Sequence, residues 1–159
     1  MIFVTVGSQK FPFNRLLKKV DEMVQNHTIA ELVYMQTGVS DYVPACCQYQ
    51  NFCNQTEFAE KMETCSIVIT HGGTGTIIDA VRRGKKTIVV PRFARYGEHV
   101  DDHQIQLVSR FHEMNLVHAC FDVEKLPEAV QIVRDHTYDT FPSNTEVFIA
   151  SVDECIRTL

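Results

Sequence analysis

Two glycine-containing segments each follow a predicted β-strand, and their backbone N–H groups could bind an anion. The run 67–78, IVITHGGTGTII, passes from an apolar strand through glycines straight into a helix. The first N–H groups of a helix have no partner within it and lie at the positive end of its dipole, so a phosphate group can bind there without Lys or Arg. The second segment, Gly7-Ser8-Gln9, follows the apolar run 2–6.

Both turns are expected at the carboxyl edge of a parallel sheet, where ligands bind open α/β folds. Two such turns facing one crevice could bind a diphosphate from both sides, and the threonines would add hydroxyl groups to the glycine backbone. For each segment, a tight turn without a ligand is the alternative. The predicted diphosphate-binding residues are Gly7, Ser8, Gly72, Gly73, Thr74, Gly75 and Thr76.

Asp79 lies one helical turn beyond Thr76, so its carboxylate is expected on the same helix face as the turn. A carboxylate there can accept two hydrogen bonds from the vicinal hydroxyls of a ribose. We therefore predict a ribose-binding role for Asp79, with an ordinary exposed helix carboxylate as the alternative.

The segment 98–104, EHVDDHQ, gathers carboxylates and imidazoles at the start of a predicted helix. His99 and His103 have the i, i+4 spacing of a metal pair, but the H-E-x-x-H arrangement and a third ligand are absent, so no metal site is predicted. We expect His103 and Gln104 to face a hydroxyl-rich or phosphate group, and the acidic residues to act as helix caps and first-turn charges.

Three common motifs are missing from the chain. The dinucleotide fingerprint G-x-G-x-x-G fails, because counting from Gly73 the third position is Ile78, and the turn follows the fourth strand instead of the first. No G-x-x-x-x-G-K-[ST] loop occurs, which argues against ATP or GTP hydrolysis. Ser8 does not lie in a G-x-S-x-G context, which argues against a hydrolase nucleophile.

Composition predicts one hydrophobic core and a reducing compartment. The chain has 159 residues, 45% of them apolar, and a formal net charge of -5 without a basic stripe, which argues against nucleic acid or an anionic lipid surface. None of the six cysteines has C-x-x-C spacing. The sequence begins with a strand-like run and contains no apolar stretch of about 18 residues, so neither a signal peptide nor a membrane span is predicted.

Short apolar runs alternate with amphipathic stretches, which is typical of an α/β fold with a Rossmann-like, mainly parallel sheet and helices on both faces. The segment 138–143 is a candidate hinge, so the last helix could lie on its own sheet or dock on a partner. The expected strands are 2–6, 31–35, 45–49, 67–70, 87–90 and 116–118. The expected helices are 13–26, 57–63, 74–83 with Gly84 as a left-handed cap, 101–112, one beginning near Pro127, and 145–159.

Three stretches, VTVGSQ at 4–9, HGGTGTIIDA at 71–80 and PRFARYGEHVDDHQ at 91–104, resemble the C-terminal, donor-binding domain of glycosyltransferase family 28, whose best-known member is MurG. The resemblance runs from the first strand to about His112 and implies the C-terminal half of a GT-B fold. The length suggests that 1–159 is this single nucleotide-sugar-binding domain standing alone. Such versions are known as the PssE or EpsE type of bacterial polysaccharide synthesis, which this sequence most resembles, and as the small cytosolic subunit of the dolichol-pathway N-acetylglucosaminyltransferase.

The resemblance implies roles at the two turns. Ser8 matches the residue of the first turn that lies near the donor diphosphate, and Thr74, Gly75 and Thr76 match the stretch of the second turn that contacts it. Asp79 stands where the family usually has Glu for the ribose hydroxyls, and its shorter side chain puts the reach in question.

The resemblance also bears on contacts to the donor sugar and to the uracil, and on catalysis. His103 and Gln104 match the pair that contacts the donor sugar. His71 replaces an Arg of MurG but is usual in the free-standing subunits, and it is the possible catalytic residue of this chain. Phe52 and Asn54 are the candidate uracil contacts.

The resemblance also implies an activity. It predicts the donor-binding catalytic subunit of an inverting hexosyltransferase that uses UDP-galactose or UDP-N-acetylglucosamine without a metal or other cofactor, and the absence of a D-x-D motif agrees. The acceptor would be a lipid-linked saccharide of exopolysaccharide or capsule synthesis. The catalytic base belongs to the missing half, so a membrane-anchored PssD or EpsD-like partner is expected to supply it and to hold this cytoplasmic chain at the inner membrane face.

Two alternatives remain open. The chain could be a non-catalytic nucleotide-sugar-binding module that activates a partner transferase. It could also be a redox enzyme that uses a dinucleotide.

Overall fold

The computed structural model describes residues 1–140, 150, 152–154 and 156–158. Within them a six-stranded sheet has the order β3-β2-β1-β4-β5-β6, and all five strand pairings are parallel. The strands are β1 (Ile2–Thr5), β2 (Val33–Gln36), β3 (Gln48–Gln50), β4 (Ile67–Thr70), β5 (Lys86–Val89) and β6 (His118–Ala119). The α-helices are α1 (Asn14–Gln25), α2 (Gln55–Thr64), α3 (Thr74–Arg82), α4 (His103–Glu113) and α5 (Leu126–Asp135), with short 3-10 helices η1 (Ala94–Tyr96) and η2 (Val123–Lys125).

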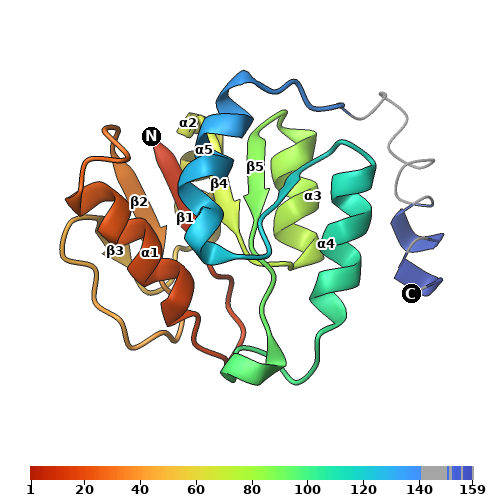
Figure 1. Cartoon of the computed structure of the whole chain (residues 1–159), viewed down its shortest axis with the longest axis horizontal. Coiled ribbons are helices and arrows are strands. Elements are labelled where there is room, and N and C mark those ends of the chain that lie inside the picture. The colour runs from red at the N-terminus through yellow and green to blue at the C-terminus, as the bar shows by residue number, and fades with distance from the viewer. Residues whose placement is uncertain (141–149, 151, 155, 159) are drawn as a thin grey trace.

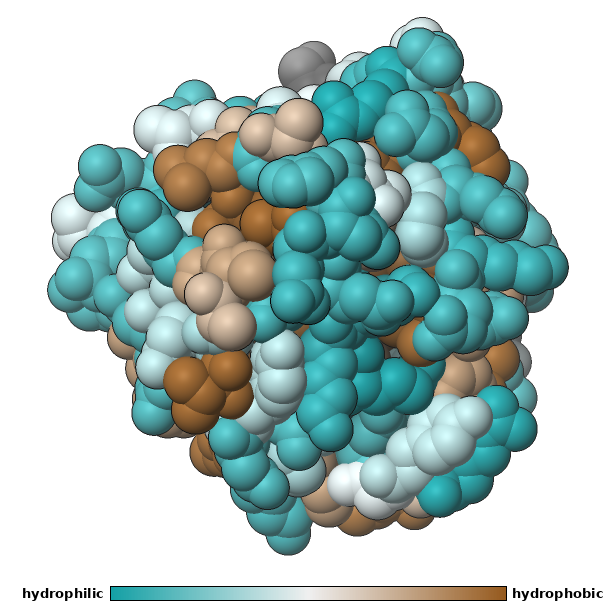
Figure 2. All heavy atoms as spheres, turned by 60° about the vertical axis from the view of Figure 1, so that its left-hand side comes forward, coloured by the Kyte–Doolittle hydropathy of each residue, from teal (hydrophilic) through white to brown (hydrophobic). Residues whose placement is uncertain are grey.

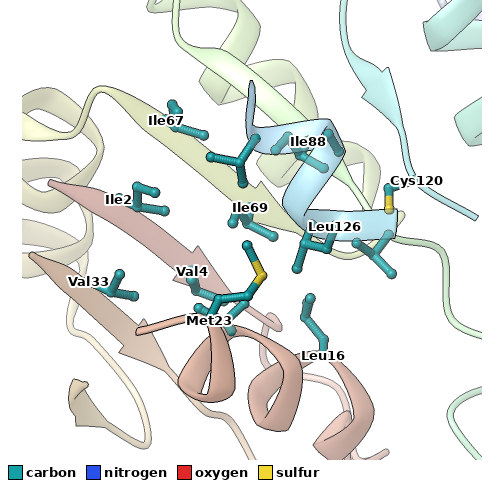
Figure 3. Packing of buried hydrophobic residues seen from close by; sticks show 14 of the residues in the cluster. Ile2, Val4, Leu16, Met23, Val33, Ile67, Ile69, Ile88, Cys120 and Leu126 are labelled. Atoms are coloured by element: carbon teal, nitrogen blue, oxygen red, sulfur yellow. The ribbon is translucent and has the colours of Figure 1, made fainter. Parts of the chain in front are cut away.

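Helices cover both faces of the sheet. Ile2 and Val4 of β1 belong to an apolar cluster with α1 and α5, whereas Phe3 between them packs with residues of α2 and α3. Successive side chains of a strand point to opposite faces, so a strand that is buried along its whole length, as β1 is, requires helices on both sides. Figure 3 shows the first of these layers, with side chains of β1, β4 and β5 directed toward α1 and α5. The predicted Rossmann-like α/β fold is confirmed.

The third strand was predicted too early, at 45–49. It begins at Gln48, because the N–H groups of Ala45 and Cys46 donate to the buried carboxylate of Asp21, both at 2.8 Å, and are therefore not available to the sheet. Strand β3 forms one edge of the sheet, and Figure 2 brings this side forward, where apolar groups are exposed between polar ones. Phe52, two residues after the end of β3, is 51% exposed.

The sixth strand, predicted at 116–118, is reduced to His118–Ala119. The N–H of Leu116 donates to the carbonyl of Phe111 at 3.1 Å, so the chain is still closing the end of α4 there, and Asn115 takes a left-handed φ of 56°. The strand can begin only after this turn is complete.

The helices follow the prediction closely. Gly84 has a φ of 65° directly after α3, as expected of a left-handed cap, and Pro127 lies in the first turn of α5. Helix α4 begins at His103, two residues later than predicted.

The predicted last helix, 145–159, falls largely on residues outside the described part, as do 141–143 of the candidate hinge. Among the described residues, 150, 152–154 and 156–157 are helical. Val152 is buried in a cluster with Leu107 and Phe111 of α4. Val152 and the partly buried Ile156 therefore pack on the domain itself, whereas residues 150, 153 and 154 are exposed. The helices of the described chain are all too short or too polar to cross a bilayer.

Candidate functional site

The two glycine turns leave the sheet at the point where the strand order reverses. Strands β1 and β4 are neighbours and run parallel, with Thr5 opposite Thr70, so the segments after them start from the same edge. Open α/β sheets bind ligands in the crevice at such a switch point. In Figure 1 this edge is at the bottom of the view, where the segments after β1 and β5 run close together.

The His71 side chain fills the space between the two turns. A Cβ atom added to Gly7 would lie 2.5 Å from Cε1 of the imidazole, and one added to Gly73 would overlap its Nε2. Gly7 also has a φ of 74°, which disfavours any other residue. The ring of His71 is thus in contact with the backbone of both turns, and only glycine at these positions leaves room for it.

The imidazole of His71 is neutral at pH 7. Burial in the first place, and then the positive charge of Arg92, lower its pKa from 6.5 to about 4. Its Nδ1 lies 3.3 Å from the hydroxyl of Thr70, which donates to the carbonyl of Thr5 at 3.0 Å. A buried neutral ring held in this way separates the turns at a fixed spacing.

Helix α3 starts at this point with open backbone donors. Its N-cap, Gly73, supplies no side-chain acceptor, and the first hydrogen bond of the helix runs from Ile77 to the Gly73 carbonyl. In the part of the chain that the structure describes, the N–H groups of Thr74, Gly75 and Thr76 have no acceptor. Gly75 is exposed and the two threonines are partly so, which leaves these three donors available to an anion.

Gln104 connects the start of α4 to this turn. Its Oε1 accepts the N–H of Gly72 at 3.2 Å and that of Arg92 at 3.0 Å. The residue is 6% exposed, and its Nε2 has no acceptor among the described residues. One half of the amide is therefore structural, and only Nε2 remains for the predicted contact with a sugar. His103 beside it is exposed, and its backbone N–H is capped by Asp101 at 3.0 Å.

Asp79 lies on the exposed side of α3. Its Oδ1 accepts the Nε of Arg83 at 2.9 Å, and Arg83 also pairs with Glu63 of α2. Exposed pairs of this kind contribute about 0.2–1 kcal/mol, so the carboxylate can exchange its partner for a ligand at small cost. Ser8 is exposed directly after Gly7.

The two candidate uracil contacts differ in availability. The Asn54 side chain accepts the N–H of Glu57 at 2.9 Å and forms a capping box at the start of α2, so its oxygen is engaged. Phe52 has an exposed ring. The segment is linked to the first turn, because Gln36 accepts the N–H of Cys53 and donates to the hydroxyl of Thr5.

A match along the full length of the chain decides the family. The pattern of the glycosyltransferase family 28 C-terminal domain covers residues 1–159. The chain belongs to this family.

Similar proteins agree with this family 28 assignment. A subunit of UDP-N-acetylglucosamine transferase, ALG13 of Yarrowia lipolytica, is 28% identical over 100 residues, which are 62% of this chain and 49% of that protein. The chain thus matches about half the length of this curated relative. A solution NMR structure of ALG13 superposes with a TM-score of 0.66 at 20% identity, covering 98% of this chain and 96% of the other. MurG of Acinetobacter baumannii gives 0.60 at 16% identity, covering 96% and 49%. These two superpositions show the shared GT-B type of fold.

The sequence did not reveal a buried charged network behind the site of this family 28 domain. Glu98, expected as a cap or first-turn charge of α4, is instead buried and accepts Nε and Nη2 of Arg15, each at 2.9 Å. Arg92 is fully buried. The one available signal was an arginine inside the otherwise apolar run VVPRF at 89–93.

No metal centre was predicted for the segment 98–104. His99 lies beside Asp101, with Nδ1 and Oδ1 3.3 Å apart. In the residues that the structure describes, no group of three or more His, Cys, Asp or Glu side chains is placed to hold a metal ion.

Proposed function

We propose that this family 28 domain binds the diphosphate of a UDP-sugar between the turns after β1 and β4 and acts as the donor-binding catalytic subunit of an inverting, metal-independent hexosyltransferase. The observation that carries the proposal is the set of three open N–H groups at the start of α3, beside the Gly7 turn and held at a fixed spacing from it by His71. These donors would bind the diphosphate and stabilise the charge that grows on the departing UDP.

The remaining predicted contacts fit around this diphosphate. Asp79 would accept the ribose hydroxyls, and His103 and the free Nε2 of Gln104 would contact the sugar. The similarity to a protein named as a subunit of UDP-N-acetylglucosamine transferase supports UDP as the nucleotide. UDP-galactose and UDP-N-acetylglucosamine are both proposed donors, the first from the likeness to capsule and exopolysaccharide proteins.

A second protein would complete the reaction. The acceptor hydroxyl oxygen bonds to the anomeric carbon while the bond from that carbon to the β-phosphate oxygen breaks, and UDP leaves with the electron pair. The proton of the hydroxyl needs a base, and His71 is buried with a pKa of about 4. We assign the base to a membrane-anchored, PssD or EpsD-like partner. It would hold this chain at the cytoplasmic face of the membrane and present a lipid-linked saccharide.

Calorimetric titration tests the nucleotide. We expect UDP to bind at least about tenfold more tightly than NAD, because the donors at α3 suit a terminal diphosphate and the dinucleotide fingerprint is absent. Binding of UDP should not require added Mg²⁺, so the titration is repeated with EDTA. A preference for NAD would overturn the transferase proposal in favour of a redox enzyme.

The buried, neutral state of His71 also favours one alternative, a non-catalytic module that binds a nucleotide sugar and activates its partner. The variant Asp79→Ala separates the two functions when UDP affinity and sugar transfer by the reconstituted pair are both measured. Loss of the ribose contact should weaken UDP binding by about tenfold. A catalytic donor subunit then loses transfer in parallel at limiting donor, whereas an activator keeps its effect.

The matched control is Arg83→Met, which breaks the ion pair with Asp79 but leaves the carboxylate in place. It should retain UDP affinity. Transfer to a lipid acceptor at the full rate by the isolated chain would contradict the requirement for a partner.

A further inference from the structure

The Arg92 side chain is the largest fully buried one in the described chain, and it lies directly behind the two glycine turns. Its Nη1 donates to the carbonyls of Phe11, Pro12 and Glu98 at 2.9, 3.2 and 3.2 Å, and its Nη2 donates to that of Val6 at 2.6 Å. All four acceptors are uncharged. The buried Nε has no partner.

The charges around Arg92 do not balance. The carboxylate of Glu98 is held by Arg15 in a two-point ion pair and also accepts the N–H of Phe93 at 3.0 Å. Arg15, Glu98 and Arg92 together therefore carry two positive charges and one negative. Burial lowers the pKa of Arg92 to about 10, so the guanidinium stays charged at pH 7. Glu98 acts on Arg92 at a distance, but Arg92 has no direct ion pair, and a buried charge of this kind is costly and needs compensation from its surroundings.

The excess positive charge lies next to both turns. Val6, whose carbonyl takes the shortest hydrogen bond from Arg92, directly precedes Gly7. The backbone N–H of Arg92 shares the Gln104 oxygen with the N–H of Gly72. The charge also acts on His71 between the turns, where it helps keep the imidazole neutral. Arg92 thus hydrogen-bonds to the Val6 carbonyl before the first turn and to the Gln104 side chain that holds Gly72 of the second turn. It does not reach the space in front of the turns.

We propose that Arg92 is the fixed positive charge of the donor site, acting from behind the turns on the diphosphate and on the departing UDP. The inference rests on the proposed function. The guanidinium is preoriented by four carbonyl groups and shielded from water, which are the conditions in which a charge acts strongly at a distance. It supplies from inside the fold part of the neutralisation that a metal ion gives elsewhere. Glu98 offsets this charge in part, but its carboxylate is itself ion-paired with Arg15.

The test compares ligands of increasing negative charge. Calorimetry with uridine, UMP and UDP is carried out on the wild type, Arg92→Met and Arg92→Lys. The loss of one positive charge, with the effective dielectric constant typical of protein sites, should weaken UDP binding by about tenfold to fiftyfold. UMP binding should weaken less, and uridine binding hardly at all. Arg92→Lys should lie between the wild type and Arg92→Met for UDP, because it keeps the charge but loses hydrogen bonds. The control is Arg95→Met, which removes an exposed guanidinium from the same segment and should change UDP affinity by less than about twofold.

Equal weakening of all three ligands in Arg92→Met would show a purely structural role and overturn the inference, as would unchanged UDP binding. A wild type that binds uridine and UDP equally would instead overturn the proposed function. If Arg92→Met does not fold, Glu98→Gln replaces it: removing the negative charge should leave UDP binding equal or tighter, whereas weaker UDP binding in a folded Glu98→Gln protein contradicts the electrostatic role.

Discussion

Replacing Gly73 with alanine is expected to lower the free energy of unfolding by about 2–3 kcal/mol and to weaken UDP binding by about tenfold or more. The added Cβ would overlap Nε2 of His71 and lie 2.9 Å from its Cε1. The ring is buried and its Nδ1 lies 3.3 Å from the Thr70 hydroxyl, so moving it away from the added Cβ would disturb the packing around it. The turn would have to shift, and the open N–H groups of α3 would shift with it. Urea denaturation and UDP titration measure the two effects.

Gly75, two residues further along the same segment, provides the stability control. A Cβ at Gly75 has no atom within 4 Å, and the residue lies within the first turn of α3, so Gly75→Ala should leave the free energy of unfolding unchanged or raise it by up to about 1 kcal/mol. The clash with His71 also predicts that the effects of Gly73→Ala and His71→Ala on the free energy of unfolding are not additive. Adding His71→Ala should cost at least about 1 kcal/mol less in the Gly73→Ala background than in the wild type. A Gly73→Ala protein of wild-type stability, or additive effects in the double variant, would contradict the role of His71 as a spacer.

The order of strands and helices was predictable because it follows from local patterns. The run 67–69 is apolar, and α1 places Leu16, Val20 and Met23 on one buried face. The boundaries that differ were set by contacts distant in sequence or by helix ends. Strand β3 starts late because Asp21 takes two of the N–H groups that precede it, and nothing near 45–49 signals this.

The site shows the same division between local features, which the sequence predicts, and contacts distant in sequence, which it does not. The glycine turns and the start of α3 are local features, so the motif was sufficient to locate their open donors. The contacts of Arg92 join it to Phe11 across 81 residues and to Val6 across 86, and its partners are carbonyl groups that every residue possesses. No residue type marks such partners in a sequence. The spacer role of His71 was hidden for a related reason, since it depends on two glycines brought together by the β1–β4 pairing.

Asp21 of α1 organises the segment that leads into β3. The carboxylate is 3% exposed and accepts the Tyr42 hydroxyl at 2.6 Å besides the N–H groups of Ala45 and Cys46. Burial by itself would raise its pKa, but the hydrogen bonds outweigh burial and hold the pKa below the ordinary 3.8. The ionised carboxylate is therefore the form that the fold stabilises.

Substituting Asp21 with asparagine should lower the free energy of unfolding at pH 7 by about 2–4 kcal/mol, because an amide NH₂ then faces groups that donate hydrogen bonds. The deficit should depend on pH. A carboxyl whose pKa is lower in the folded than in the unfolded chain stabilises the fold above its unfolded pKa, and that contribution is lost as the pH falls below about 3.9 toward the folded pKa. Urea denaturation at pH 7 and at lower pH should therefore show the wild type approaching Asp21→Asn. Glu22→Gln, at the next and exposed position, should differ from the wild type by less than about 0.5 kcal/mol. A deficit that stays constant with pH would mean that the carboxylate charge is not what orders the segment before β3.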